Sequence, residues 1–237
     1  MSEPLVIIGS GGYAQEVLWI VDDINARKPS WNFLGFIDQE NLGRKGPTLY
    51  GRPVLGGYDV LAGLPPGTQF ASGVGSPRIR QKVCEAAENR GLIPCTPLIH
   101  PTVVTARHVE IGHGTVIGAG SILAPYASIG RHCAINLHVT VGHDSKIRDY
   151  CVLSPGARVS GNAVLEQGVF MGTNATIYVD RHVGAGATVA ANSFLLTNLG
   201  AGLSAIGIPA KVFSHASEAG TCAIQEIRQN AISRDRQ

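Results

Sequence analysis

The apolar positions of this chain follow two different periods. From residue 111 to residue 195 an apolar, nearly always aliphatic, side chain returns at every sixth position without an insertion. These fifteen positions are Ile111, Ile117, Leu123, Ile129, Ile135, Val141, Ile147, Leu153, Val159, Leu165, Met171, Ile177, Val183, Val189 and Leu195. A period of six fits neither the 3.6 residues per turn of an α-helix nor the alternation of a β-strand. It fits a solenoid in which each coil has three short, flat sides.

The residues that follow each aliphatic position support this interpretation. The next residue is often Gly, and the fourth is usually small, as at Thr115, Ala127, Cys133 and Cys151. Small side chains fit the narrow interior near a corner, and Gly or Asn allows the backbone to turn. Three hexapeptides make one coil, so the fifteen hexapeptides make five coils, each rising about 4.8 Å. We expect residues 98–107 to add an irregular first coil.

A β-sandwich is the main alternative for this central segment. Its strands would alternate at period 2 and would be joined by turns of varied length. Because one phase is kept over all fifteen hexapeptides, the sequence favours a parallel β-helix over residues 98–213.

The chain before the repeat predicts a small α/β domain over residues 1–97. Residues 5–8 form a short apolar run typical of a buried strand, and residues 15–24 show helical spacing of apolar side chains. Residues 33–37 predict a second strand, which ends at Asp38. Between the first strand and the helix lies a glycine loop of the form G-x-G-x-x-A, made of Gly9, Ser10, Gly11, Gly12, Tyr13 and Ala14.

Such a loop lets the backbone approach a phosphate, whose charge the N-terminus of the following helix stabilises. A full dinucleotide fold needs two such halves, and only about 95 residues precede the repeat, so we expect a mononucleotide site. The alternative is a tight turn that binds nothing. Residues 70–77 predict a further strand and loop before a helix, which makes Gly75, Ser76 and Arg80 candidates for closing over the same nucleotide. Arg80 has a second interpretation as a solvated charge on the helix.

Composition disfavours several classes of partner. The formal net charge is +2 and the Lys and Arg residues are scattered, so we expect no nucleic-acid or membrane surface. No apolar run approaches the roughly 20 residues of a membrane span, and the first residues lack the features of a secretion signal. The five Cys residues are widely spaced and include no CxxC pair, which argues against disulfides or a zinc site. We therefore expect a cytoplasmic protein without a bound metal.

Several segments together resemble one family of enzymes. They are the glycine loop of residues 9–14, residues 75–80, the passage Ile99-His100-Pro101, residues 135–144 and the closing residues 206–211. With the hexapeptide repeat, they make the chain similar, over roughly residues 4–213, to the sialic acid O-acetyltransferase and bacterial nucleotide-sugar N-acetyltransferase family. The resemblance implies a left-handed coil and acetyl-CoA as the acyl donor.

The resemblance also implies the roles of particular residues. It makes His143 the general base with Asp144 beside it, places Asn136 near the sugar, and directs the amide of Gly161 to the acetyl carbonyl. The repeat itself brings His143 and Gly161 together, because residues one coil apart stack about 4.8 Å from each other. A His is suited to accept the proton of the attacking group, a carboxylate to orient the imidazole, and a backbone N–H to stabilise an oxyanion.

By the same resemblance, the pantetheine arm of acetyl-CoA lies in a groove between two neighbouring prisms, which implies a homotrimer. Gly161, Gly172 and Ala187 are expected at this groove, since the later coils are rich in small residues. Lys211 follows the closing Gly-Ile-Pro-Ala turn and is expected to meet the phosphates of CoA. The alternative is that the small residues only satisfy the geometry of the coil.

Three features depart from the family pattern. The glycine loop has Tyr13 where many relatives have His, and Val152 stands where several have a second His, nine residues after the base. Residues 214–237 extend past the usual end, with apolar side chains spaced as a short amphipathic helix. Of the remaining His residues, we expect His100 to help pack the junction of the two domains.

The resemblance therefore implies an enzyme that moves an acetyl group from acetyl-CoA to the amino group of a UDP- or GDP-linked 4-amino sugar in surface glycan biosynthesis. Two alternatives stay open. One is an O-acetyltransferase acting on a sugar hydroxyl, such as that of sialic acid, and the other is a non-catalytic β-helix, such as a scaffold or a zinc-containing trimer. The glycine loop alone would also suit an NAD-dependent oxidoreductase, which the small N-terminal domain disfavours.

Overall fold

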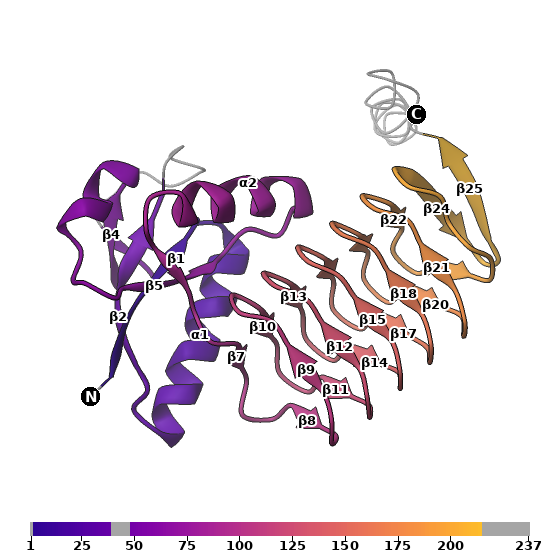
Figure 1. Cartoon of the computed structure of the whole chain (residues 1–237), viewed down its shortest axis with the longest axis horizontal. Coiled ribbons are helices and arrows are strands. Elements are labelled where there is room, and N and C mark those ends of the chain that lie inside the picture. Colours follow the sequence, from indigo (N-terminus) through magenta and orange to yellow (C-terminus); the bar gives the residue numbers. More distant parts are fainter. Residues whose placement is uncertain (1, 39–47, 215–237) are drawn as a thin grey trace, which may run out of the picture.

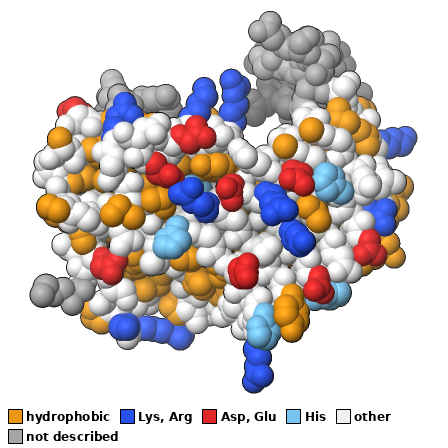
Figure 2. Space-filling view, in the orientation of Figure 1, with side chains coloured by type: hydrophobic (Ala, Val, Ile, Leu, Met, Phe, Trp, Pro, Cys, Tyr) orange, Lys and Arg blue, Asp and Glu red, His pale blue; other side chains and the backbone are white. Residues whose placement is uncertain are grey.

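The structure is a computed structural model that describes residues 2–38 and 48–214. An α/β domain stands at the N-terminal end, and a stack of coils extends away from it (Figure 1). Figure 2 shows acidic and basic side chains interspersed over one face of the molecule. Within the described ranges, no helix has both the length and the apolar character that a membrane crossing requires. The helix predicted within residues 214–237 lies outside the described residues, apart from Ser214.

The N-terminal domain is built on a six-stranded sheet with the order β3-β4-β2-β1-β5-β6. Its strands are β1 (Glu3–Ile8), β2 (Trp31–Ile37), β3 (Thr48–Leu49), β4 (Arg52–Gly56), β5 (Gln69–Ser72) and β6 (Ile93–Pro94). Its helices are α1 (Gly12–Arg27), the 3-10 helix η1 (Tyr58–Gly63) and α2 (Pro77–Glu88). The described strands pair in parallel except β3 with β4. The predicted order of strand, glycine loop, helix and strand is confirmed.

The rest of the described chain forms a β-helix of short strands that build three faces. Face 1 contains β7 (Leu98–Ile99), β10 (Val116–Ile117), β13 (Ala134–Ile135), β16 (Val152–Leu153), β19 (Phe170–Met171), β22 (Thr188–Val189), β24 (Leu203–Gly207) and β25 (Ala210–Ser214). Face 2 contains β8 (Val104–Thr105), β11 (Ile122–Leu123), β14 (Thr140–Val141), β17 (Arg158–Val159), β20 (Thr176–Ile177) and β23 (Phe194–Leu195). Face 3 contains β9 (Glu110–Ile111), β12 (Ser128–Ile129), β15 (Lys146–Ile147), β18 (Val164–Leu165) and β21 (His182–Val183). Successive strands of a face pair in parallel one coil apart, as Ala134 does with Val116 and Val152, except that β24 and β25 pair antiparallel.

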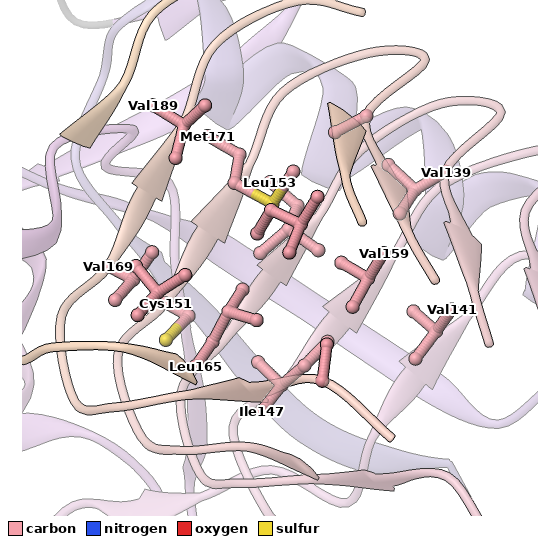
Figure 3. Packing of buried hydrophobic residues seen from close by; sticks show 14 of the residues in the cluster. Val139, Val141, Ile147, Cys151, Leu153, Val159, Leu165, Val169, Met171 and Val189 are labelled. Atoms are coloured by element: carbon pink, nitrogen blue, oxygen red, sulfur yellow. The ribbon is translucent and has the colours of Figure 1, made fainter. Parts of the chain in front are cut away.

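The aliphatic residue of each hexapeptide points into the prism, as predicted. Figure 3 shows Leu153, Met171 and Val189, from successive coils of face 1, among the side chains of the interior. They share this interior with Val159 of face 2 and Leu165 of face 3, and all five are at most 2% exposed. Burial of such side chains contributes roughly 25 cal/mol per Å² of apolar surface, so the interior is the main stabilising element of the coils.

The first coil is regular, and our expectation of an irregular one was wrong. β7 pairs with β10 and β8 with β11 in the register of the later coils. Thr105 occupies the inward position that carries an aliphatic residue further along the chain, and it is exposed. A β-branched polar residue keeps the strand geometry where no apolar side chain has to be covered. The hydrophobic signal is therefore lost although the coil continues.

The turns of the coils use Gly and Asn, as predicted, but not the glycine that directly follows the aliphatic residue. Left-handed backbone occurs three residues after the aliphatic position, for example at Asp144 (φ 58°) and Asn162 (φ 57°). Gly142, which directly follows Val141, does not have left-handed backbone. A Cβ atom there would lie 2.5 Å from the backbone nitrogen of Gly161 in the next coil. The glycine beside the aliphatic residue is thus required by the close approach of two coils.

The N-terminal domain packs on face 1 of the first coils. Leu98 and Val116 belong to the same buried cluster as side chains of β1 and α1. Nε2 of His100 lies 2.8 Å from Oδ2 of Asp23, and its ring centroid lies 5.1 Å from that of Trp19. The prediction that His100 helps to pack the junction is confirmed.

Candidate active site

His143 and Asp144 form a polar pair on the edge of the prism where face 2 meets face 3. His143 comes two residues after the buried Val141 of β14, and Asp144 is the left-handed corner residue. Both side chains are more than half exposed, at 59% and 53%. Nδ1 of the imidazole lies 2.8 Å from Oδ2 of the carboxylate. The pair therefore projects from a rigid scaffold into the space outside the prism.

This contact determines how the imidazole can act. A carboxylate only accepts hydrogen bonds, so it holds the imidazole proton on Nδ1 and leaves the lone pair on Nε2. Nε2 lies toward Gly161, where an added Cβ atom would be 2.5 Å away from it. His143 thus presents a proton acceptor on the side of the next coil.

Gly161 contributes a backbone donor to the same place. The ladder between coils uses the N–H groups of Ser160, which donates to Ile177, and of Asn162, which donates to the carbonyl of His143 at 2.9 Å. In the described part of the chain, the N–H of Gly161 has no acceptor. A proton acceptor and an available N–H donor therefore lie side by side, which is the arrangement that acyl transfer requires.

A second polar site lies in the N-terminal domain, at the ends of β1 and β2. A cavity of about 190 Å³ is lined by Gly9 and Asp38 together with Tyr58, Lys82 and apolar side chains. The hydroxyl of Ser10 donates a hydrogen bond to Oδ2 of Asp38. The structure thus brings together three of the predicted substrate-binding residues, Gly9, Ser10 and Asp38.

The other glycines of the loop lie at the start of α1. Gly11 is the N-cap residue and Gly12 the first helical residue, and no atom lies within 4 Å of the position of an added Cβ at either one. The open backbone and the N-terminus of a helix of 16 residues suit an anionic group such as a phosphate.

A larger cleft of about 870 Å³ separates the N-terminal domain from the edge of the prism where face 3 meets face 1. The domain contributes the predicted residues Gly75 and Ser76. Its other wall includes Gln167 and Phe170, which sequence reasoning missed. The repeat contained a usable signal, because Phe170 and Thr188 occupy the same outward position in adjacent coils and both line this cleft.

The N-terminal domain matches a known family, and the whole chain is similar to solved structures that contain both domains. Residues 4–87 match the model of the PglD N-terminal domain. The perosamine N-acetyltransferase of Caulobacter crescentus, solved with CoA and GDP-perosamine, is 26% identical with a TM-score of 0.80 over 89% of this chain and 97% of that one. The acetyltransferase domain of PglB from Neisseria gonorrhoeae FA1090 is 28% identical with a TM-score of 0.80 over 90% of this chain and 100% of that one.

Residues 4–87 thus carry a PglD-type N-terminal domain, and the chain as a whole is similar in structure to bacterial N-acetyltransferases. Its coils are those of a left-handed parallel β-helix. WeeI from Acinetobacter baumannii AYE is a further similar structure, 25% identical with a TM-score of 0.79 over 90% of this chain and 100% of that one. A search of curated protein sequences gives no match.

Arg80 of this acyltransferase does not lie where either interpretation placed it. It is fully buried, so it is not a solvated charge. Its guanidinium donates to the carbonyls of Ser72, Val74, His132 and Cys133, and it is absent from both cavities. The prediction that Arg80 closes over the nucleotide was wrong, because backbone carbonyls already occupy its donors.

Tyr13 stands beside this arginine. The Arg80 guanidinium carbon lies 5.7 Å from the centroid of the Tyr13 ring. Burial raises the pKa of Tyr13 to about 12, although the positive charge of Arg80 opposes the shift. The phenol therefore stays neutral over the physiological range.

Two residues expected at the CoA groove lie elsewhere. Ala187 is fully buried inside the prism, because the fourth position after each aliphatic residue points inward. Gly172 is buried too, and a Cβ atom there would collide with the backbone of Ala191 in the next coil. Both residues satisfy the geometry of the coil instead. Lys211 is exposed on β25, as its expected role requires.

Asn136 and Val152 lie at face 1 of the prism, away from His143. Asn136 directly follows β13 of face 1, so face 2 separates it from His143 within one chain. Val152 is 2% exposed on face 1 and cannot reach the solvent side of the site. The structure therefore brings neither residue to the His143 edge.

Proposed function

We propose that this chain transfers an acetyl group from acetyl-CoA to the amino group of a UDP- or GDP-linked 4-amino sugar, in the cytoplasmic biosynthesis of surface glycans. The observation that carries this proposal is the imidazole Nε2 of His143 beside the available N–H of Gly161, with Nδ1 held by Asp144. The choice of acetyl-CoA as donor and of a nucleotide-linked sugar as acceptor is supported by similar proteins solved with CoA and GDP-perosamine and with acetyl coenzyme A.

The reaction follows from the two groups. The lone pair of the sugar amine attacks the thioester carbonyl, while Nε2 of His143 takes the amine proton. The carbonyl oxygen gains the negative charge and accepts a hydrogen bond from Gly161, an interaction of about 3 kcal/mol in comparable sites. The tetrahedral intermediate then collapses, the carbon–sulfur bond breaks, and the imidazolium returns its proton to the leaving thiolate. No covalent acyl-enzyme is needed, and Cys133 and Cys151 lie buried inside the prism.

The N-terminal domain would hold the nucleotide. In this proposal the diphosphate lies at the glycine loop and the start of α1, the nucleoside enters the cavity beside Asp38, and the sugar extends past Gly75 and Ser76 into the large cleft. The cleft, at about 870 Å³, has room for the sugar and the end of the acyl donor.

The acceptor and the base belong to different copies of the chain in this proposal. The cleft opens on the edge between faces 3 and 1, whereas His143 lies on the edge between faces 2 and 3, so the five strands of face 3 separate them within one chain. Gly161 and Gln167 belong to the same coil, so both sites stand at about the same height along the prism. A cyclic trimer with parallel prisms would bring the cleft of one copy to His143 of the next.

The acyl donor would then lie between two prisms. Its thioester carbonyl has to reach Gly161, so the pantetheine arm runs along the edge between faces 2 and 3. Lys211, exposed on β25 near the far end of the prism, is placed to meet the CoA phosphates.

The test is a screen of UDP-, GDP-, CMP- and dTDP-linked 4-amino sugars with acetyl-CoA, detecting free thiol and the mass of the product. We expect transfer to the amine of a UDP- or GDP-linked sugar, well above the hydrolysis of acetyl-CoA alone. Transfer only to hydroxyl acceptors such as sialic acid would identify an O-acetyltransferase instead. Absence of any transfer would favour a non-catalytic β-helix.

A further inference from the structure

Arg80 is a fully buried cation that the proposed chemistry does not use. In the described ranges no carboxylate lies within ion-pair distance of it, and four backbone carbonyls surround it. Burying a charge is costly unless it is both hydrogen-bonded and paired with an opposite charge, and Arg80 has hydrogen bonds but no such pair, so the fold retains this residue against an energetic penalty. The segments that supply the four carbonyls show what Arg80 holds together.

Two of the four carbonyls lie at the end of β5 and in the loop that joins β5 to α2. Nη1 of Arg80 donates to Val74 at 2.8 Å and to Ser72 at 3.2 Å. Val74 lines the small cavity of the N-terminal domain, and the next residues, Gly75 and Ser76, line the large cleft. This loop, residues 72–78, is therefore a wall that the two cavities share.

The other two carbonyls belong to the β-helix. Nε of Arg80 donates to His132 at 2.5 Å and Nη2 to Cys133 at 3.2 Å. The ring of His132 is itself fixed, because it stacks against Phe70 and Tyr150 with centroids 5.5 and 5.4 Å away. Arg80 thus joins the shared wall to a rigid corner of the prism.

Only arginine has the donor geometry for this position. Its planar guanidinium presents donors in several fixed directions, whereas a lysine ammonium is a single point with three donors on a flexible stem. A lysine at position 80 would keep the charge but would leave part of the four carbonyls without a donor.

We propose that Arg80 is a positioning residue that holds the loop of residues 72–78 against the β-helix and thereby sets where the nucleotide-linked acceptor lies. Its effect on catalysis rests on the function proposed above. The loop would lose its fixed distance to the prism without this residue, while the edge that carries His143 and Gly161 would stay unchanged. Arg80 therefore acts on the binding of the acceptor and not on that of acetyl-CoA.

Hydrogen exchange tests the clamp without any assay of activity. The amide of Gly73 donates to Ile8 at 2.7 Å, so peptides covering residues 70–78 report on the loop. In Arg80→Met we expect exchange there to rise at least about tenfold, with a smaller rise in Arg80→Lys and no change over residues 152–171. The matched control is Tyr150→Asn, which removes a stacking partner from the same junction but leaves all four carbonyl contacts. An unchanged loop in Arg80→Met, or an equal rise in Tyr150→Asn, would overturn the proposal.

Kinetics with the acceptor found in the screen then separates positioning from general destabilisation. We expect Arg80→Lys to raise KM for the acceptor about tenfold and KM for acetyl-CoA less than twofold. Equal changes in both KM values, or the same pattern in Tyr150→Asn, would count against a positioning role. If the wild-type chain acetylates no nucleotide sugar, the proposed function fails, while the exchange experiment still decides whether Arg80 fixes the loop.

Discussion

Asp144 meets a structural and a chemical requirement in one residue. Its backbone is left-handed, a conformation that Asp and Asn adopt more readily than most residues, and its carboxylate fixes the proton on Nδ1 of His143. The six-residue period predicted that His143 and Gly161 lie in adjacent coils, because that follows from chain geometry alone. It could not show that the coil-to-coil ladder passes over the N–H of Gly161, since this depends on the orientation of one peptide group.

Replacing Asp144 by Asn should keep the backbone and lose the charge. We expect kcat to fall about tenfold or more with KM values unchanged, because the amide holds the imidazole less firmly and does not stabilise its protonated form. Asp180→Asn is the matched control, since Asp180 has the same left-handed backbone on the same edge, at φ 59°. Steady-state kinetics of both variants tests this prediction. A kcat of Asp144→Asn equal to that of Asp180→Asn would show that Asp144 has no role in the mechanism.

Gly161→Ala should abolish most of the activity without unfolding the coil. The added methyl would lie 2.5 Å from Nε2 of His143 and would displace the imidazole, so we expect kcat to fall about 100-fold. Thermal unfolding should change little, because Gly161 does not have left-handed backbone. Ser160→Ala serves as the neighbouring control. A Gly161→Ala enzyme with normal kcat would show that the two groups do not work together.

At the scale of elements, sequence reasoning succeeded where a regular period carries the signal. The strands of the β-helix follow from the aliphatic residues, and the apolar patterns on either side of the glycine loop correctly predicted the first strand and helix. It missed the regular first coil, because the exposed Thr105 takes the inward position there and the aliphatic signal is absent. It also misplaced Arg80, since its four acceptors are backbone carbonyls from two domains and leave no mark in the sequence.

The junction of the two domains should weaken on acidification. Burial lowers the pKa of His132 below its usual 6.5, although a hydrogen bond to Glu88 opposes the shift. Its Nδ1 is buried without a partner among the described residues, so a second proton there would have no acceptor. The unfolded chain therefore binds this proton more readily, and the free energy of unfolding falls as the pH drops below about 6.5.

Burial alone would raise the pKa of Glu88, but hydrogen bonds from His132 and Arg131 outweigh it and lower that pKa below 4.5. The contribution of the Glu88 carboxylate to the free energy of unfolding is thus lost only at a lower pH than that of His132. We expect His132→Asn, which suits the left-handed backbone of that position, to be less stable than wild type at pH 7.5. Thermal unfolding at several pH values should show this difference shrinking toward pH 5.5. A difference that stays constant or widens would contradict the account.

At the scale of the whole molecule, the proposed active site needs two copies of the chain. Sequence similarity suggested a trimer, but only the structure shows that the cleft and His143 lie on different edges of one prism.

Mixed oligomers test this arrangement directly. His143→Ala lacks the base, and Ser76→Trp fills the cleft, so each should be nearly inactive alone. Co-expressed in equal amounts, they should recover about a quarter of wild-type activity, because each site needs an intact base from one variant and an intact cleft from the other. Size-exclusion chromatography with light scattering would show whether the complex is a trimer. Mixed oligomers that stay inactive would place the whole site within one chain.

The most direct test of the account is single-turnover acetyl transfer by His143→Ala, measured with saturating acetyl-CoA and the acceptor identified in the screen. The rate constant should fall at least about 100-fold, while the dissociation constants of acetyl-CoA and of the acceptor stay within about twofold of wild type. A variant that transfers the acetyl group at nearly the wild-type rate would show that the imidazole beside Gly161 is not the base.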